Sequence, residues 1–153
     1  MSPDRTPAGD AFAAFAISVL RLAGHLQTAG DALAKPVGQT SARWQVLAAA
    51  DHAPMSVADA GRALGMTRQG VQRVADLLEK DGLILYAENP AHQRAKLMVL
   101  TDAGKTTLEA IKARQAVWAN ALGELFDKKH LQQATETVIT ALQAVEKQSV
   151  LDD

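Results

Sequence analysis

Arginine and glutamine side chains occur together in the segment from residue 67 to residue 84, and their types suit hydrogen bonding to the edges of DNA bases. The polar set is Arg68, Gln69, Gln72 and Arg73. Arg can donate two hydrogen bonds to a guanine edge in the major groove, and Gln can exchange two with an adenine edge. The segment could therefore recognise base sequence, provided that these side chains share one exposed face.

The apolar residues of the same segment predict a helix that exposes them. They recur at intervals of three and four and form one packed face: Val71, Val74, Leu77 and Leu78. Thr67 is expected to cap the start of this helix and Gly82 to end it. Such a helix has the form of a DNA recognition helix, although the charge pattern alone fits a solvated surface helix equally well.

The neighbouring elements favour the DNA-binding interpretation. Ser56 is expected to cap a short helix over 57–64, and the turn at Gly65 and Met66 would join it to the next helix as a helix-turn-helix. Another short helix is predicted over 41–50, with Thr40 or Ser41 as its cap. Two short strands, 83–87 and 95–100, would flank a loop rich in turn-forming residues, which is typical of a wing.

Long amphipathic helices are predicted on both sides of this lobe, from about Asp10 to Ala34, from 102 to about 126, and from 127 to about 150. The lobe over about 41–100 is too small to cover their apolar faces, so burial against a second copy with two-fold symmetry is expected. The expected organisation is a disordered tail (1–9), a dimerisation helix (10–38), a winged helix-turn-helix lobe (40–101) and dimerisation helices (102–153). The fold class is mainly α with a small β-wing.

The composition restricts the other possibilities. The 153 residues include no Cys, which excludes disulfides and thiolate chemistry. No apolar run approaches the ~20 residues of a membrane span, so a soluble, cytoplasmic protein is expected. The net charge is only −1. Residues 62–80 nevertheless hold four basic and two acidic residues, so the positive charge is concentrated at the predicted recognition helix.

The order of these motifs resembles the MarR (multiple antibiotic resistance regulator) family of bacterial transcription factors. The matching segments cover most of the chain: 41–47, 56–65, 67–84, 89–95, and 97–104 with its Leu-Thr-x-x-Gly pattern. The resemblance implies a homodimer that binds double-stranded DNA at a pseudo-palindromic operator. It also implies a repressor that is released by a small phenolic or aromatic effector.

The wing departs from the family pattern. The family usually has Asp-x-Arg there, with the Asp steadying an Arg that enters the minor groove. In this chain Arg94 is present, but His92 occupies the Asp position and Gln93 lies between them. Tyr86 also stands where a basic residue is common. Fewer phosphate contacts are therefore expected from the wing, and with them a lower affinity for DNA.

The predicted DNA-binding residues are Ser56, Thr67, Arg68, Gln69, Gln72, Arg73, Arg94 and Lys96. Arg73 and Gln69 are the first choices for base contacts, and Arg94 for the minor groove. Hydroxyls at helix starts can hold phosphate, so Ser56 and Thr67 are included, although each could be only a cap. Lys96 is expected to meet phosphate or solvent.

The candidate effector-binding residues are His25, Arg43, Trp44 and Trp118. Either tryptophan could instead be an ordinary core residue. The four histidines have no metal-ligand spacing, and no nucleophile stands beside a base, so neither a metal, a cofactor nor an enzymatic activity is expected. The main alternative to a ligand-responsive regulator is a winged-helix protein-interaction or architectural module without operator specificity.

Overall fold

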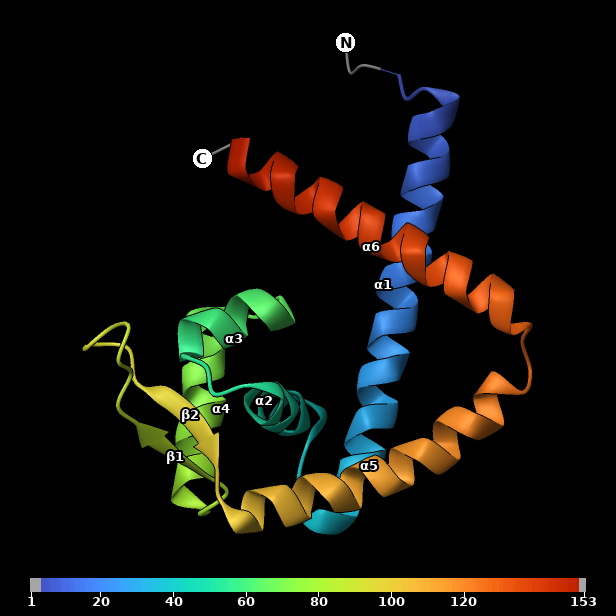
Figure 1. Ribbon diagram of the computed structural model, residues 1–153. Helices are drawn as coiled ribbons and strands as arrows, with labels where there is room; N and C mark the ends of the chain where they lie inside the picture. Colours follow the sequence, from blue (N-terminus) through green and yellow to red (C-terminus); the bar gives the residue numbers. More distant parts are fainter. Residues whose placement is uncertain (1–3, 152–153) are drawn as a thin grey trace. The chain divides into compact units, whose positions relative to one another are not determined.

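The computed structural model describes residues 4–151 and divides into two compact units, residues 1–113 and 114–153. The elements, in chain order, are α1 (Pro7–Ala34), the 3-10 helix η1 (Lys35–Val37), α2 (Ser41–His52), α3 (Val57–Leu64), α4 (Arg68–Lys80), β1 (Ile84–Ala87), β2 (Leu97–Leu100), α5 (Asp102–Gly123) and α6 (Lys128–Leu151) (Figure 1). The chain is mainly helical with one small antiparallel sheet, which confirms the predicted fold class.

The first helix begins earlier than the sequence analysis predicted. It starts at Pro7 instead of Asp10, because the Thr6 hydroxyl accepts a hydrogen bond from the Gly9 amide at 3.1 Å and proline suits the first helical position. Of the predicted disordered tail, residues 7–9 are therefore helical. Residues 4–6 carry no regular structure, and residues 1–3 lie outside the described part.

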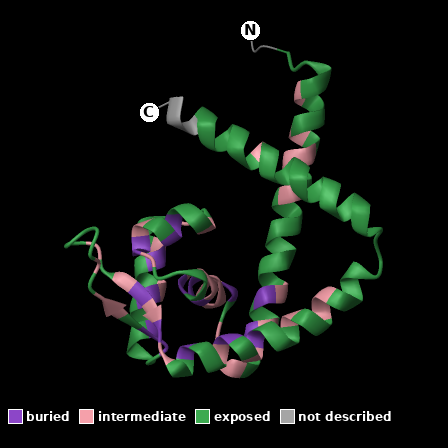
Figure 2. Ribbon diagram, in the orientation of Figure 1, coloured by how far each residue is buried: buried purple, intermediate pink, exposed green. Residues whose placement is uncertain are grey.

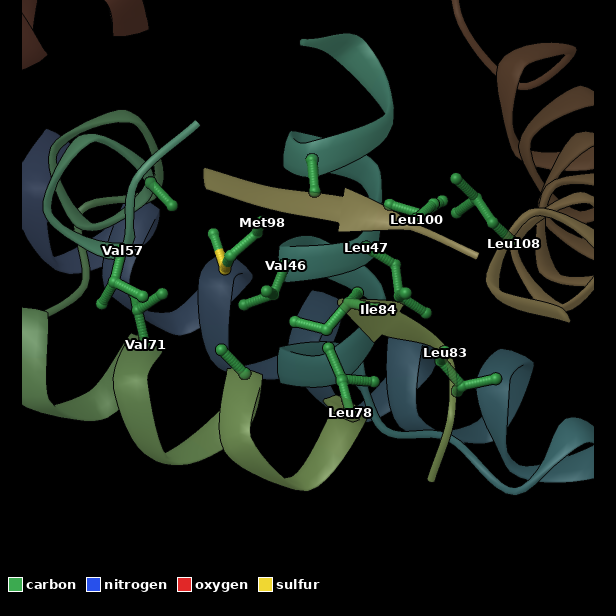
Figure 3. Close-up of a cluster of buried hydrophobic side chains, with 13 residues drawn as sticks. Val46, Leu47, Val57, Val71, Leu78, Leu83, Ile84, Met98, Leu100 and Leu108 are labelled. Atoms are coloured by element: carbon green, nitrogen blue, oxygen red, sulfur yellow. The ribbon is translucent and has the colours of Figure 1, made fainter. Parts of the chain in front are cut away.

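The lobe formed by α2, α3, α4 and the sheet holds the main hydrophobic core (Figure 3). Helix α4, which the sequence predicts to be a recognition helix, contributes Val71, Ala75 and Leu78, all fully buried. This is one continuous face, so packing of the apolar side forces the polar residues at 68, 69, 72 and 73 outward. The predicted helix and its N-cap Thr67 are confirmed. The predicted packed face is wrong at Leu77, which is exposed, because Ala75 takes the buried place between Val71 and Leu78.

The wing strands are shorter than predicted. They pair from Ile84 with Leu100 to Ala87 with Leu97. Leu83 precedes the first strand because Gly82, at φ 75°, turns the chain there. The second strand starts only at Leu97, because the Ala95 amide is engaged in a turn with the His92 carbonyl at 3.2 Å.

Helix α5 starts against the lobe through an unusually close approach. A Cβ atom at Gly104 would lie 2.0 Å from the Leu83 carbonyl oxygen, so only glycine fits. The Thr101 hydroxyl donates to the Gly82 carbonyl at 2.6 Å and accepts from the Gly104 amide at 3.1 Å. Further along α5, Leu108 is fully buried within the lobe core. These contacts make the start of α5 part of the lobe.

Most residues of α1, α5 and α6 are exposed (Figure 2), and many of the exposed residues are large and apolar. The exposed large apolar residues of α1 are Phe12, Ile17, Leu20, Leu22 and Leu26. By length and composition alone, Pro7–Val37 could cross a membrane, with a mean hydropathy of 1.2. This differs from the prediction that no apolar run approaches the length of a membrane span, because the many alanines of α1 raise its mean hydropathy although polar residues interrupt it.

Candidate nucleic-acid interface

A surface hollow of about 250 Å³ lies where the start of α3, the polar face of α4 and the wing meet. Its lining residues are Ser56, Val57, Ala58, Arg68, Gln72, Tyr86, Arg94, Ala95 and Lys96. Five of the eight predicted DNA-binding residues therefore come together from three elements. Two others, Gln69 and Arg73, line a shallower hollow of about 450 Å³ further along α4 with Gln72, and Thr67 lies at the start of the same helix.

The cations of this surface are not neutralised by the protein. Arg68, Arg73, Arg94 and Lys96 are all exposed, and none of them makes an ion pair within the described range 4–151. Some cations elsewhere in the chain are paired, as Lys112 is with Asp51 at 3.1 Å. Unpaired guanidinium and ammonium groups on one face can neutralise phosphates without first breaking internal contacts. The net charge of the chain conceals this local excess.

The two helix-capping hydroxyls differ in what they can still do. The Thr67 hydroxyl oxygen accepts from the Gly70 amide at 3.0 Å, and its hydrogen has no acceptor among residues 4–151. Ser56 is buried, and it both accepts from the Asp59 amide and donates to the Asp59 carboxylate. Hydrogen bonds from Ser56 and Arg62 lower the pKa of Asp59. Thr67 can therefore donate to a phosphate, whereas Ser56 already has a carboxylate as its partner.

A hydrogen-bond network that the sequence analysis did not anticipate connects α4 with β1. The Gln72 amide nitrogen donates to the Asp76 carboxylate at 2.8 Å and to the Tyr86 hydroxyl at 3.0 Å, and the Tyr86 hydroxyl donates to Asp76 at 3.0 Å. Burial, followed by the contact with Asp76, raises the pKa of Tyr86, so its hydroxyl stays protonated as a donor. The only feature of the sequence that pointed to this network was Tyr86, which stands where a basic residue is common in the family.

The wing loop is shaped by Asn89. Its side-chain oxygen accepts from the Ala91 amide at 3.0 Å, and its carbonyl accepts from the His92 amide at 3.2 Å. Such a turn needs no contact with the rest of the lobe. The exposed Arg94 follows this turn directly and also lines the hollow.

Of the four candidate effector-binding residues, the three in the first unit, His25, Arg43 and Trp44, do not line one hollow. Trp44 lines a third hollow, of about 750 Å³, between α1, α2 and the end of α3. His25 is exposed on α1 and is not among its lining residues. Arg43 pairs with Asp81 at 2.7 Å and so connects α2 with the end of α4. Trp118 is half-buried and belongs to the second unit.

Comparisons with known proteins agree with this geometry. Residues 38–95 match the model of the MarR family, and an uncharacterized protein of Mycobacterium tuberculosis is 40% identical over 138 residues, covering 88% of this chain and 96% of that protein. The chain belongs to the MarR family. The transcriptional activatory protein BadR of Rhodopseudomonas palustris is 26% identical over 86% of this chain and 76% of BadR.

Solved structures show the same MarR fold. The transcriptional repressor CouR bound to a 23-mer DNA duplex aligns with a TM-score of 0.75 over 91% of this chain and 99% of CouR, at 23% identity. CouR from Rhodococcus jostii RHA1 bound to p-coumaroyl-CoA aligns with a TM-score of 0.73 over 81% and 88%, at 21% identity. The fold and the family are therefore those of transcription regulators.

Proposed function

We propose that this MarR-family chain is a sequence-specific DNA-binding repressor that acts as a homodimer on a pseudo-palindromic operator. The observation that carries the proposal is the polar face of α4, which is exposed over a packed back and flanked by unpaired cations of the wing. Arg73 and Gln69 would contact bases, while Arg68, Lys96 and Thr67 would contact the phosphate backbone. Arg94 would enter the minor groove.

A second copy of the chain is the proposed cover for the apolar faces of the long helices. Besides those of α1, the exposed apolar residues include Val117, Leu122, Leu125, Phe126, Leu131, Val138, Ile139, Leu142 and Val145. A two-fold axis would bury such faces isologously and would place two copies of α4 about 34–36 Å apart, one turn of DNA. A DNA-bound CouR structure aligns over 91% of this chain. The alignment must include part of α1, because the chain without the 28 residues of α1 is shorter than the aligned length. This supports a role for α1 in the shared fold and not in a membrane.

A small aromatic or phenolic effector is the proposed regulator. The hollow beside Trp44 has a volume within the range of small-molecule sites, which is roughly 300–1,000 Å³. CouR, which has the same fold, binds p-coumaroyl-CoA. An effector here would favour one spacing of the two α4 helices over another, and it can weaken DNA binding only by its difference in affinity for the two states. Such a regulator would act in the cytoplasm.

Fluorescence anisotropy with the full chain tests the proposal. The probes are labelled duplexes covering the DNA upstream of the coding region, with a shuffled duplex of equal composition as reference. Arg73→Ala is expected to remove most of the preference for the specific duplex, about 5–150-fold per lost base contact, and to leave a salt-sensitive background. Lys105→Ala, an exposed cation on α5, serves as the matched control and should leave the preference unchanged.

Two outcomes would contradict the proposal. Equal binding of wild type to all duplexes would favour the alternative of an architectural or protein-binding module. A single subunit in sedimentation at micromolar concentration would remove the basis for a palindromic operator.

A further inference from the structure

The network of Gln72, Asp76 and Tyr86 determines which hydrogen-bonding groups α4 can offer to a base. A glutamine amide has two N–H donors and one carbonyl acceptor. Both contacts of the Gln72 nitrogen are internal, to the Asp76 carboxylate at 2.8 Å and to the Tyr86 hydroxyl at 3.0 Å. Because a carboxylate only accepts, the amide nitrogen must face Asp76, and the carbonyl oxygen points away from it.

Tyr86 completes the arrangement. Its single hydroxyl hydrogen is donated to Asp76 at 3.0 Å, so its oxygen can only accept the hydrogen bond from Gln72. All donors of the three side chains are then used inside the network. The Gln72 carbonyl oxygen has no partner among residues 4–151, and Gln72 lines the hollow between α4 and the wing.

We propose that Tyr86 and Asp76 are positioning residues that set base preference by presenting Gln72 as a hydrogen-bond acceptor. This inference rests on the proposed function, because it requires the polar face of α4 to meet base edges. In the major groove, adenine and cytosine carry amino donors, whereas guanine and thymine present acceptors at the corresponding places. Gln72 therefore favours adenine or cytosine over guanine or thymine and discriminates little between the first two.

Removing one hydroxyl changes this preference in a defined way. Tyr86→Phe keeps the ring and frees one Gln72 N–H. Gln72 can then pair with adenine through both its N6 amino group and N7, which cytosine cannot match. The affinity for a duplex with adenine, relative to one with cytosine, should rise roughly tenfold at the position that Gln72 contacts. Asp76→Ala removes the acceptor of both Gln72 and Tyr86, so the amide is no longer held in one orientation, and the preference for adenine or cytosine over guanine or thymine should weaken.

The experiment measures relative dissociation constants on a panel of duplexes in which every position of a selected site carries each of the four bases. The variants are Tyr86→Phe, Asp76→Ala, Gln72→Ala and the double variant Gln72→Ala with Tyr86→Phe. Gln72→Ala identifies the contacted position, where it should flatten the preference. In that background Tyr86→Phe should cause no further change, because it acts through Gln72. Gln69→Ala is the control on the same helix. When it is combined with Tyr86→Phe, the changes in binding free energy of the two single variants should add.

The outcomes separate the two proposals. If wild type discriminates between sites but Tyr86→Phe leaves the adenine-to-cytosine ratio unchanged at every position, and Asp76→Ala leaves the preference for adenine or cytosine over guanine or thymine unchanged, the inference about Gln72 is wrong and the proposed function stands. The inference is also wrong if Tyr86→Phe shifts the ratio equally in the Gln72→Ala background. If wild type shows no preference for any sequence, both proposals fail.

Discussion

The two unpaired cations of the wing should account for a measurable part of the salt dependence of DNA binding. Arg94 and Lys96 are exposed, line the hollow beside α4 and have no acidic partner among the described residues. We consider the double variant Arg94→Gln with Lys96→Gln. In a dimer it removes two cations from each of two subunits. If Lys96 at a phosphate and Arg94 in the minor groove each displace counterions as one phosphate contact does, the slope of log K against log salt concentration should become shallower by about 3.6, at ~0.9 per cation.

Such a difference is large on the scale of an affinity titration. Between ~50 and ~200 mM salt, wild type should lose roughly 150-fold more affinity than the double variant. Fluorescence anisotropy at four or five salt concentrations gives the slope directly. Lys112→Gln is the control, because this lysine already pairs with Asp51 and Glu109 and should not change the slope. An unchanged slope in the double variant would refute the assignment of the wing to the DNA interface.

Three further predictions concern stability and can be measured by urea denaturation. Leu78→Ala should lower the free energy of unfolding by about 2–5 kcal/mol, because Leu78 is fully buried in the lobe core. Gly104→Ala should cost about 1–3 kcal/mol or more, since its Cβ would overlap the Leu83 carbonyl, whereas Gly24→Ala, with open space around it, should not destabilise. Tyr86 has a raised pKa in the folded state, so the unfolded state loses this proton first. The stability from Tyr86 should be complete below its ordinary pKa of 10.0 and should decline as pH rises above it, and Tyr86→Phe should remove that part of the decline.

Local patterns in the sequence were sufficient to predict the elements of the lobe. The apolar residues of α4 recur at helical spacing, and capping by Thr67 and Ser56 depends on residues only three positions away. The fold class and the family could be predicted for the same reason, because the order of the elements is itself a property of the sequence. The start of α1 was misplaced because capping by Thr6 was not considered.

Contacts between distant residues could not be predicted in this way. Tyr86 meets Gln72 across 14 positions, and Arg43 meets Asp81 across 38 positions. Both contacts depend on how separate elements pack against each other. The spacing of apolar residues and the capping residues, from which the elements were predicted, carry no information about such contacts. As a result Gln72 was expected to be a free base-reading amide, and Arg43 a possible effector ligand, while each has a partner within the lobe. The DNA-binding and effector-binding roles themselves remain predictions.

The most direct test of the central claim is selection of duplexes from a random-sequence pool by the full-length protein. We expect enrichment of an inverted repeat whose half-sites are centred about 10 base pairs apart, one turn of DNA, because two copies of α4 must enter successive major grooves. Arg73→Ala should abolish this enrichment. A pool that remains unenriched for wild type, or that yields a single half-site with no symmetry, would contradict the account.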